Sequence, residues 1–190
     1  YEDSKELIGR WHQNGRATYV ISPRFAPTST PGQLEAAGAL WREHPTTLLQ
    51  THIDENRNEI AWVKELFPGD TDYLAVYQRF GLVGPGANFG HAIHLTKREI
   101  AALRATGSGV SHCPTSNLFI GSGLFDLAGL AAGKRPVPIG LATDVGGGSS
   151  FSMLATMRAA YEISQLRGVA LHPLRAFYLA TVGSARVMRL

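Results

Sequence analysis

The chain has 190 residues, of which 44% are hydrophobic and 17% are charged, and its formal net charge is +3. This length and composition favour a globular unit with a real core over a disordered chain. Lysine and arginine are scattered and form no basic block, which argues against a nucleic-acid partner and against a polybasic membrane anchor. Cys113 is the only cysteine. A disulfide framework within the chain is therefore excluded, and we expect a reducing, cytoplasmic setting.

No stretch of the sequence has the character of a membrane span. The longest uncharged run, residues 105–125, contains four glycines, a proline and several hydroxyl residues. A bilayer helix needs ~20 predominantly apolar residues. The chain begins with YEDSK, which is neither a Met start nor a signal peptide, so we expect a piece of a longer polypeptide.

Hydrophobic periodicity predicts alternating helices and strands along the chain. The expected strands are residues 17–21, 46–50, 88–93, 109–113 and 137–143. The expected helices are residues 1–14, a segment opened by Thr30 and Pro31, and residues 57–67, 72–80, 97–106, 124–132, 149–166, 173–181 and 184–190, with residues 115–117 as a polar loop. No hairpin turn signal such as Asn-Gly lies between the expected strands, which predicts parallel strands joined by right-handed helical crossovers.

The strand order leaves two α/β architectures, an open doubly wound sheet and a (β/α)₈ barrel. A chemically capable side chain follows or ends every expected strand, namely Arg24, His52, His91, His112 and Asp144. A barrel gathers such ends around one mouth, whereas an open sheet spreads them along a line. We therefore predict a TIM-type barrel. A full barrel has eight strands and typically ~250 residues, so five strands make an incomplete one.

His52 and Glu55 form the stretch around which the functional hypothesis is built. His52 follows a buried strand, and Glu55 lies three residues later in the loop before a helix. A neutral imidazole is a good ligand for a divalent metal, and a nearby carboxyl can move the proton of a metal-bound water. Taken alone, these residues are explained more simply as a buried histidine followed by a helix-capping acid, because short motifs often match by chance.

Asp144 could complete a metal site with His52. A histidine nitrogen and an aspartate oxygen make a mixed donor set typical of Zn²⁺ or Fe²⁺. Asp144 could instead cap the glycine-rich turn at residues 146–148. That glycine triplet matches neither the P-loop nor the dinucleotide-binding fingerprint, so we reject a phosphate site there.

The remaining histidines are not equally good candidates for metal binding or catalysis. Side chains alternate along a strand, so His91 and His94 cannot both face one metal, and His91 is the better inward candidate. His112 fits an inward structural imidazole at least as well as a ligand. We expect surface positions for the histidines on helices or helix ends, His12, His44 and His172.

Arg24 and Phe25 are the best substrate-reading pair in the sequence. A guanidinium makes a bidentate contact with the carbonyl oxygen and ring nitrogen of guanine, and a neighbouring Phe can stack on the ring. The alternative has Arg24 pairing with a loop acid and Phe25 filling the core. By residue type alone, the two explanations are equally good.

Several motifs taken together resemble the amidohydrolase superfamily in order and approximate spacing. They are THIDENR at residues 51–57, GH at 90–91, SHCPTSN at 111–117 and GLATDVGG at 140–147. The PRF segment at residues 23–25 adds a resemblance to the guanine-deaminating branch of that superfamily. The resemblance implies a metal-dependent barrel that hydrolyses guanine to xanthine and ammonia, and we expect a homodimer of the full-length protein.

The resemblance also implies roles for particular residues. His52 and Asp144 would be metal ligands for Zn²⁺, with Fe²⁺ as the alternative, and Glu55 would be the proton shuttle. His91 would lie beside the metal-bound water and share the catalytic work with Glu55 and Asp144.

The purine would be bound by a set that overlaps the metal ligands. Its members would be Arg24, Phe25, His52 and Asp144. The first-strand His-x-His pair of the superfamily and its flanking β-sandwich are absent. We therefore expect residues 1–190 to be a single segment holding about the fourth to eighth βα units. The alternatives are a deaminase or chlorohydrolase for another heterocycle, or a catalytically inactive barrel segment.

Overall fold

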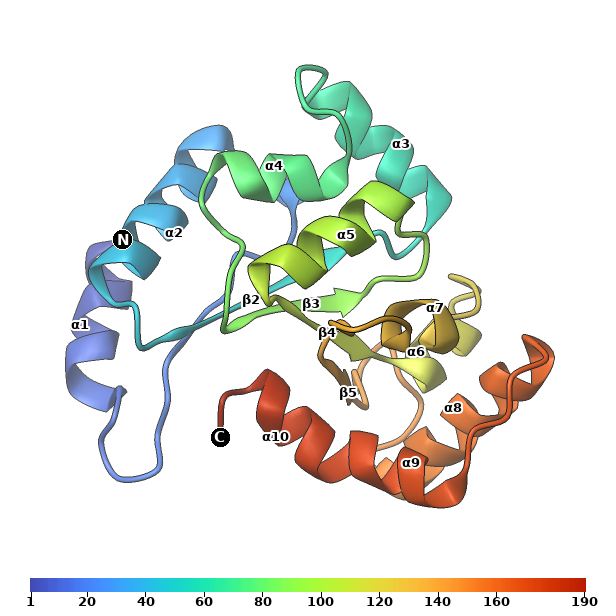
Figure 1. Cartoon of the computed structure of the whole chain (residues 1–190). Coiled ribbons are helices and arrows are strands. Elements are labelled where there is room, and N and C mark those ends of the chain that lie inside the picture. The colour runs from blue at the N-terminus through green and yellow to red at the C-terminus, as the bar shows by residue number, and fades with distance from the viewer.

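The computed structural model describes all residues, 1–190, and its centre is one parallel sheet (Figure 1). The five strands are β1 (Val20–Ile21), β2 (Leu48–Ile53), β3 (Ala87–His91), β4 (Gly109–His112) and β5 (Ile139–Leu141). They are ordered β1-β2-β3-β4-β5, and every neighbouring pair is parallel. A doubly wound sheet reverses its strand order at a switch point, whereas a barrel adds strands in sequence. The sequential order therefore supports the predicted barrel.

Helices connect all the strands. The helices are α1 (Glu2–Trp11), α2 (Pro31–Glu43), α3 (Arg57–Leu66), α4 (Tyr73–Arg79), α5 (Lys97–Thr106), α6 (Pro114–Phe119), α7 (Leu127–Ala131), α8 (Met153–Leu166), α9 (Pro173–Tyr178) and α10 (Ser184–Val187). A 3₁₀ turn, Ala26–Thr28, follows β1, and a π-helical turn, Leu179–Gly183, joins α9 to α10. None of the helices combines the length and apolarity needed to cross a bilayer.

Helix boundaries follow local capping chemistry. Thr30 accepts a hydrogen bond from the Gln33 N–H, and Pro31 fills the first helical position of α2, as the sequence predicted. The expected capping box at Thr96 and Glu99 is present at the start of α5. A second capping box starts α3, where Asn56 and Glu59 satisfy each other's backbone N–H groups.

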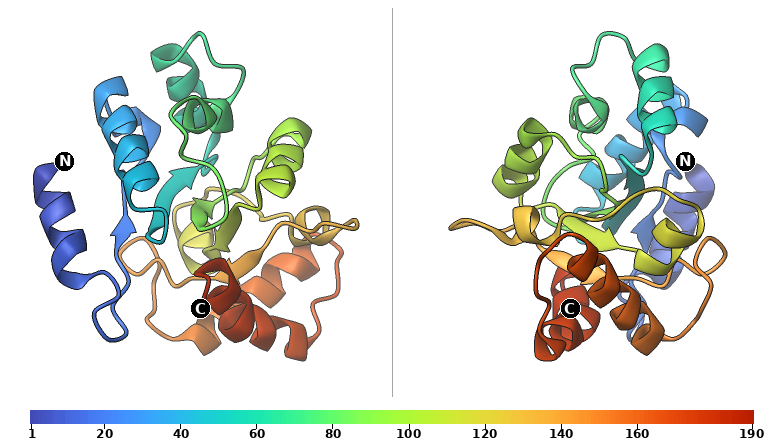
Figure 2. Two further views of the ribbon diagram at one scale, coloured as in Figure 1. Left: turned by 60° about the vertical axis from the view of Figure 1, so that its left-hand side comes forward. Right: turned by 90° about the vertical axis from the view of Figure 1, so that its right-hand side faces the viewer.

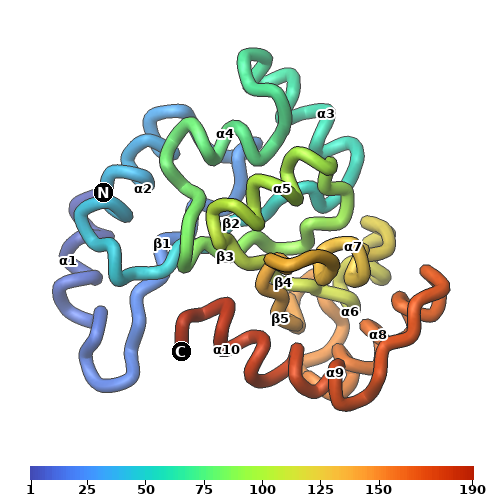
Figure 3. Tube along the Cα trace, in the orientation of Figure 1, coloured from blue at the N-terminus to red at the C-terminus, as the bar shows by residue number.

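The helices are divided between the two sides of the sheet. Helices α3, α4 and α5 lie together along one side, and α8, α9 and α10 lie on the other side beside β4 and β5 (Figures 1 and 2). The tube in Figure 3 passes once around the sheet, from α1 through α3–α5 to the red C-terminal helices. Helix α10 packs directly on the sheet, because Cβ atoms added at Gly109 and Gly140 would meet Val187 and Ser184.

The two faces of the sheet have different chemistry. Leu49, Phe89 and Val110 are fully buried in the main hydrophobic core. On the opposite face, the Asn88 and Ser111 side chains hydrogen-bond to each other across β3 and β4 at 2.9 and 3.1 Å. Full burial of such apolar side chains stabilises a fold by about 1.5–3 kcal/mol each, so the first face holds the sheet together. The second face carries the polar side chains that can take part in binding or catalysis.

Most predicted elements are present, but one predicted loop and several predicted boundaries were wrong. Residues 115–117 were expected to form a loop, but they belong to α6. Pro114 occupies the first position of this helix, where its missing N–H does not matter. Strands β1 and β5 and helices α7 and α8 are shorter than expected, and β2 runs on to Ile53 instead of ending at residue 50. Helix α8 begins only at Met153, because the Ser152 side chain caps it by accepting the Ala155 N–H.

Candidate metal and active site

A cavity of about 330 Å³ lies against the polar face of the sheet and reaches the carboxyl ends of its strands. Four strands and the loop after β5 contribute side chains to its lining. Its chemically capable members are Gln50, His52, Asn88, His91, Ser111, Cys113 and Asp144. Three of the predicted site residues, His52, His91 and Asp144, therefore share one cavity.

His52 is held by the chain segment that follows β1. Its Nδ1 lies 2.7 Å from the carbonyl oxygen of Arg24, and its backbone N–H donates to the same oxygen at 3.2 Å. A carbonyl oxygen only accepts, so Nδ1 carries the proton and Nε2 is left with its lone pair. A histidine fixed in this way by its second nitrogen is the usual form of a metal-ligating histidine.

His91 enters the cavity through an unusual backbone conformation. Asn88 and Gly90 line the cavity, so strict alternation would turn His91 to the opposite face. His91 is the last residue of β3 and has φ +71°, in the left-handed region that non-glycine residues rarely adopt. This conformation breaks the alternation and brings the imidazole into the cavity beside Gly90. The ring centroids of His91 and His52 are 5.0 Å apart.

Glu55 is held against His91 by two further side chains. Its Oε1 lies 3.3 Å from His91 Nδ1 and accepts hydrogen bonds from Ser122 Oγ at 3.2 Å and Asn117 Nδ2 at 3.5 Å. Asn117 Nδ2 also lies 3.0 Å from His91 Nδ1. The fully buried Asn117 amide therefore touches both groups that the sequence assigned to proton transfer.

The protonation states in this cluster follow from burial. Burial raises the pKa of Glu55 above its ordinary value, and the negative charge of Glu59 is the second-largest cause of this rise. Burial and the neighbouring His52 lower the pKa of His91 to about 4. His91 is therefore neutral at neutral pH, so its 3.3 Å contact with Glu55 is not an ion pair, and its Nδ1 can accept the Asn117 Nδ2 hydrogen bond. A carboxyl with a raised pKa next to a neutral imidazole is suited to accept and return a proton.

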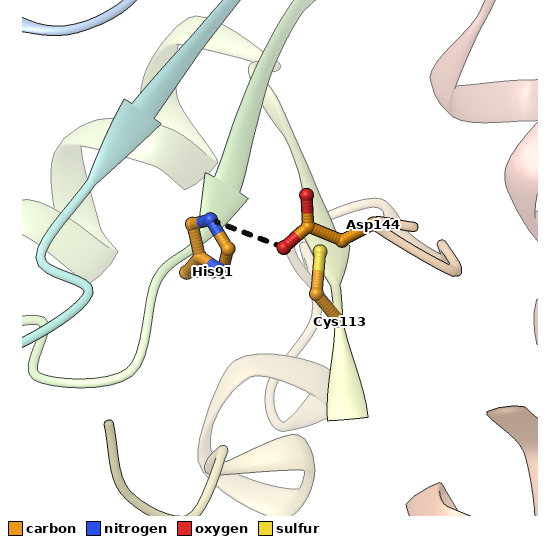
Figure 4. A group of neighbouring side chains, drawn as sticks. All are labelled: His91, Cys113 and Asp144. Carbon is orange, nitrogen blue, oxygen red and sulfur yellow. Dashed lines mark ion pairs between the residues drawn. The ribbon is translucent and has the colours of Figure 1, made fainter. Parts of the chain in front are cut away.

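Asp144 follows β5 in a tight turn that needs its glycines. Asp144 has φ +47°, and the Gly148 N–H donates to its carbonyl oxygen. A Cβ atom at Gly148 would lie 2.0 Å from the Thr143 carbonyl oxygen, and one at Gly147 would lie 3.2 Å from Asp144 Oδ2. The glycine triplet therefore makes room for the backbone and the carboxylate. The Oδ2 atom lies 4.0 Å from His91 Nε2, as the dashed line in Figure 4 shows.

Comparison with known proteins identifies the family. Residues 2–190 match the sequence profile of the Amidohydrolase family. The chain belongs to the amidohydrolase family. This finding confirms the resemblance drawn from the motifs, and with the sequential parallel sheet it confirms the barrel class of the fold.

Relatives of this amidohydrolase chain include well-matched deaminases. The guanine deaminase of Escherichia coli K12 is 49% identical over 190 residues, which cover the whole chain and 43% of that relative. A probable guanine deaminase of Deinococcus radiodurans is 45% identical and is covered to 44%. The chain thus spans less than half the length of these curated relatives.

Solved structures agree with the sequence comparison. The structure of E. coli guanine deaminase superposes on the whole chain with a TM-score of 0.97 and 48% identity, covering 44% of that structure. Guanine deaminase from C. acetobutylicum, solved with guanine bound in its active site, has a TM-score of 0.90 and 28% identity over 98% of the chain and 46% of that structure.

The donor set in the amidohydrolase cavity fits a divalent metal. His52 offers a free Nε2, and Asp144 offers a half-buried carboxylate on the same cavity. One ligand atom each of His91, Cys113 and Asp144 lie within 4.8 Å of one another, as Figure 4 shows for the three side chains. Burial raises the pKa of the Cys113 thiol to about 12, so it is a protonated, weak ligand. Nitrogen and oxygen donors remain, and these suit Zn²⁺ or Fe²⁺.

Arg24 and Phe25 stand at the edge of the site rather than in its cavity. The Phe25 ring centroid lies 5.9 Å from the His52 ring, and the Arg24 guanidinium lies 5.4 Å from the Phe25 ring. The Arg24 side chain is exposed. Neither side chain lines the 330 Å³ cavity, so their contact with a purine stays a prediction.

The other histidines have structural surroundings. His94 lies beyond β3 and its Nε2 is 2.8 Å from the Ser122 carbonyl oxygen. His112 is buried and stacks on Phe125 at 4.2 Å, and burial lowers its pKa to about 3. His172 is exposed as expected, whereas His12 and His44 are half-buried, and His12 accepts the Tyr19 N–H. Their burial corrects the expected surface position.

Asn117 and Ser122 are the site residues that sequence reasoning missed. Asn117 lies on α6 and Ser122 follows that helix, and both contact Glu55 from more than 60 positions away in the sequence. The signal that could have found Asn117 is the proline after β4, which predicts a helix start at residue 114 and not a loop.

Proposed function

We propose that this chain carries the catalytic half of a metal-dependent hydrolase that deaminates guanine to xanthine and ammonia. The observation that carries the proposal is the position of His91, which contacts Glu55 through Nδ1 at 3.3 Å and faces Asp144 through Nε2 at 4.0 Å, in a cavity shared with His52. Guanine deaminases among the relatives, one of them solved with guanine bound, support the substrate.

A bound Zn²⁺, or Fe²⁺ as the alternative, would be held by His52 and Asp144, and it would supply a hydroxide at neutral pH by lowering the pKa of its bound water towards 7. The hydrogen bond from His52 Nδ1 to Arg24 keeps Nε2 unprotonated for this purpose. The superfamily's first-strand pair of histidines would complete the ligand set. We therefore propose that residues 1–190 are about the fourth to eighth βα units of a longer barrel domain.

Glu55 would move the proton. Its raised pKa allows the carboxylate to take a proton from water and return it to a ring nitrogen of the purine, which makes the amino-bearing carbon more electrophilic. His91 and Asp144 would orient the attacking water and stabilise its addition to that carbon, and ammonia would leave after a second proton delivery. Ser122 and Asn117 hold the Glu55 carboxyl in one place, so little reorganisation accompanies the transfer.

Arg24 and Phe25 would grip the purine from the edge of the cavity. The Phe25 ring lies 5.9 Å from the His52 ring and 5.4 Å from the Arg24 guanidinium, so a flat ring bound beside His52 would meet the Phe25 ring. Arg24 is exposed and free to turn towards the carbonyl oxygen of guanine. His52 and Asp144 would meet the opposite end of the same ligand. A homodimer stays a prediction.

The test is ammonia release by metal-quantified full-length protein from guanine, adenine and cytosine. We expect turnover with guanine, and turnover with another heterocycle alone would refute this substrate. Glu55→Gln should keep the metal and lose most turnover, because the amide cannot carry the proton. Arg24→Ala should raise KM for guanine by roughly tenfold, the value of one charged hydrogen-bonding contact. A metal-replete Glu55→Gln protein with normal turnover would remove Glu55 from the mechanism.

A further inference from the structure

The hydroxyl group of Tyr77 stands inside the sheet, where a backbone hydrogen bond would normally be. Tyr77 belongs to α4 and is completely buried. Its hydroxyl accepts a hydrogen bond from the Ala26 N–H at 3.0 Å and donates one to the His52 carbonyl oxygen at 2.8 Å. The function proposed for the site does not use this buried tyrosine.

The geometry of a parallel strand pair shows what the hydroxyl replaces. The His52 N–H donates to the Arg24 carbonyl oxygen at 3.2 Å, one residue further along the chain than the register of β1 and β2 gives, since Val20 is opposite Leu48 and Ile21 is opposite Leu49. From this shifted register, the next bond of a parallel pair would run from the Ala26 N–H to the His52 carbonyl oxygen. The Tyr77 hydroxyl instead hydrogen-bonds to both of these backbone groups. It therefore separates the segment after Phe25 from β2 by the width of one hydroxyl.

A second side chain ties the same atoms together. Thr51 Oγ1 lies 3.1 Å from the Arg24 carbonyl oxygen and 3.1 Å from the Tyr77 hydroxyl. The Arg24 carbonyl oxygen also receives the His52 Nδ1 bond. Phe25 is therefore clamped on both sides, through its neighbours Arg24 and Ala26. These hydrogen bonds therefore fix the position of the segment that carries Arg24 and Phe25 relative to His52.

We propose that Tyr77 is a positioning residue that sets where Arg24 and Phe25 stand relative to His52, and so governs affinity for the purine. This inference rests on the proposed function of the site. Tyr77 does not line the cavity, so its hydroxyl would act only through the backbone of the Arg24–Ala26 segment. Without it, two buried polar groups lose their partner, and the segment must shift towards β2 or loosen.

Tyr73 offers a matched control on the same helix. Its ring stacks on Tyr77 at 5.5 Å and is equally buried, but its hydroxyl donates to Glu59 Oε1 at 2.8 Å. Tyr73→Phe therefore loses one buried hydroxyl of the same kind from the same helix. It leaves the bonds to Ala26 and His52 in place, so it reports any general loss of stability.

The experiment compares Tyr77→Phe and Tyr73→Phe in the metal-loaded full-length protein. Steady-state kinetics with guanine should show KM raised by about tenfold in Tyr77→Phe with kcat within about twofold, and KM unchanged in Tyr73→Phe. Hydrogen–deuterium exchange over residues 24–29 should be about tenfold faster in Tyr77→Phe only, because Ala26 N–H loses its partner. Metal content should equal that of the wild type in both variants.

Thr51→Val supplies a second route if Tyr77→Phe folds poorly, and a smaller rise in KM is expected from it. The inference is overturned if Tyr77→Phe keeps the wild-type KM and exchange, if it loses kcat or metal with KM unchanged, or if both tyrosine variants change KM equally. A wild-type protein that releases no ammonia from guanine would refute the proposed function instead. The exchange of residues 24–29 then decides the positioning role alone: faster exchange supports it, and unchanged exchange overturns it.

Discussion

Asn117→Ala isolates the group that joins Glu55 to His91. The amide is fully buried, lies 3.0 Å from His91 Nδ1 and donates at 3.5 Å to Glu55 Oε1. The variant loses one good hydrogen bond and one long bond to a carboxylate, together worth about 2 kcal/mol. Because 1.4 kcal/mol is a factor of ten, we expect kcat to fall ~30-fold. The KM should change little, since the amide does not line the cavity.

The assay is ammonia release by the full-length protein at saturating guanine, with metal content measured on the same preparation. Asn58→Ala is the matched control, because it removes an exposed amide from α3, close to Glu55 in the sequence but outside the cluster. Asn117→Asp should be worse than Asn117→Ala, because a second carboxylate beside Glu55 opposes its ionisation. Wild-type kcat in metal-replete Asn117→Ala would show that the amide is not needed to hold Glu55.

Three further outcomes follow from the structure. His112 has a pKa of about 3 when folded, below its unfolded value of about 6.5, so the unfolded chain binds more protons and stability falls as pH drops from 6.5 towards 3. The free energy of unfolding measured in urea should be about 2 kcal/mol lower at pH 5 than at pH 7 because of this group. The difference between the two pH values should be smaller in His112→Phe. Gly148→Ala should lower the melting temperature by several degrees, because its Cβ would collide with the Thr143 carbonyl oxygen at 2.0 Å. Asp144→Asn should lower metal content at equilibrium dialysis by at least roughly tenfold, and an unchanged content would exclude this carboxylate as a ligand.

Local sequence chemistry determined much of the fold before tertiary contacts were considered. The capping boxes, the Thr30-Pro31 helix start and the alternation of strands with amphipathic helices depend on interactions within a few residues. The same local logic placed His52 at the end of a strand and Glu55 in the following loop. The motif spacing was enough to predict the barrel class and the family.

Only the tertiary structure decided which face each side chain serves and which distant groups meet. His91 reaches the cavity through a left-handed backbone angle that periodicity cannot reveal, since alternation would place it on the core face. Asn117 meets Glu55 across 62 positions of sequence, and Tyr77 meets Ala26 across 51. Such contacts depend on how helices pack over the strand ends, and that packing is set by burial of the whole core rather than by any short segment.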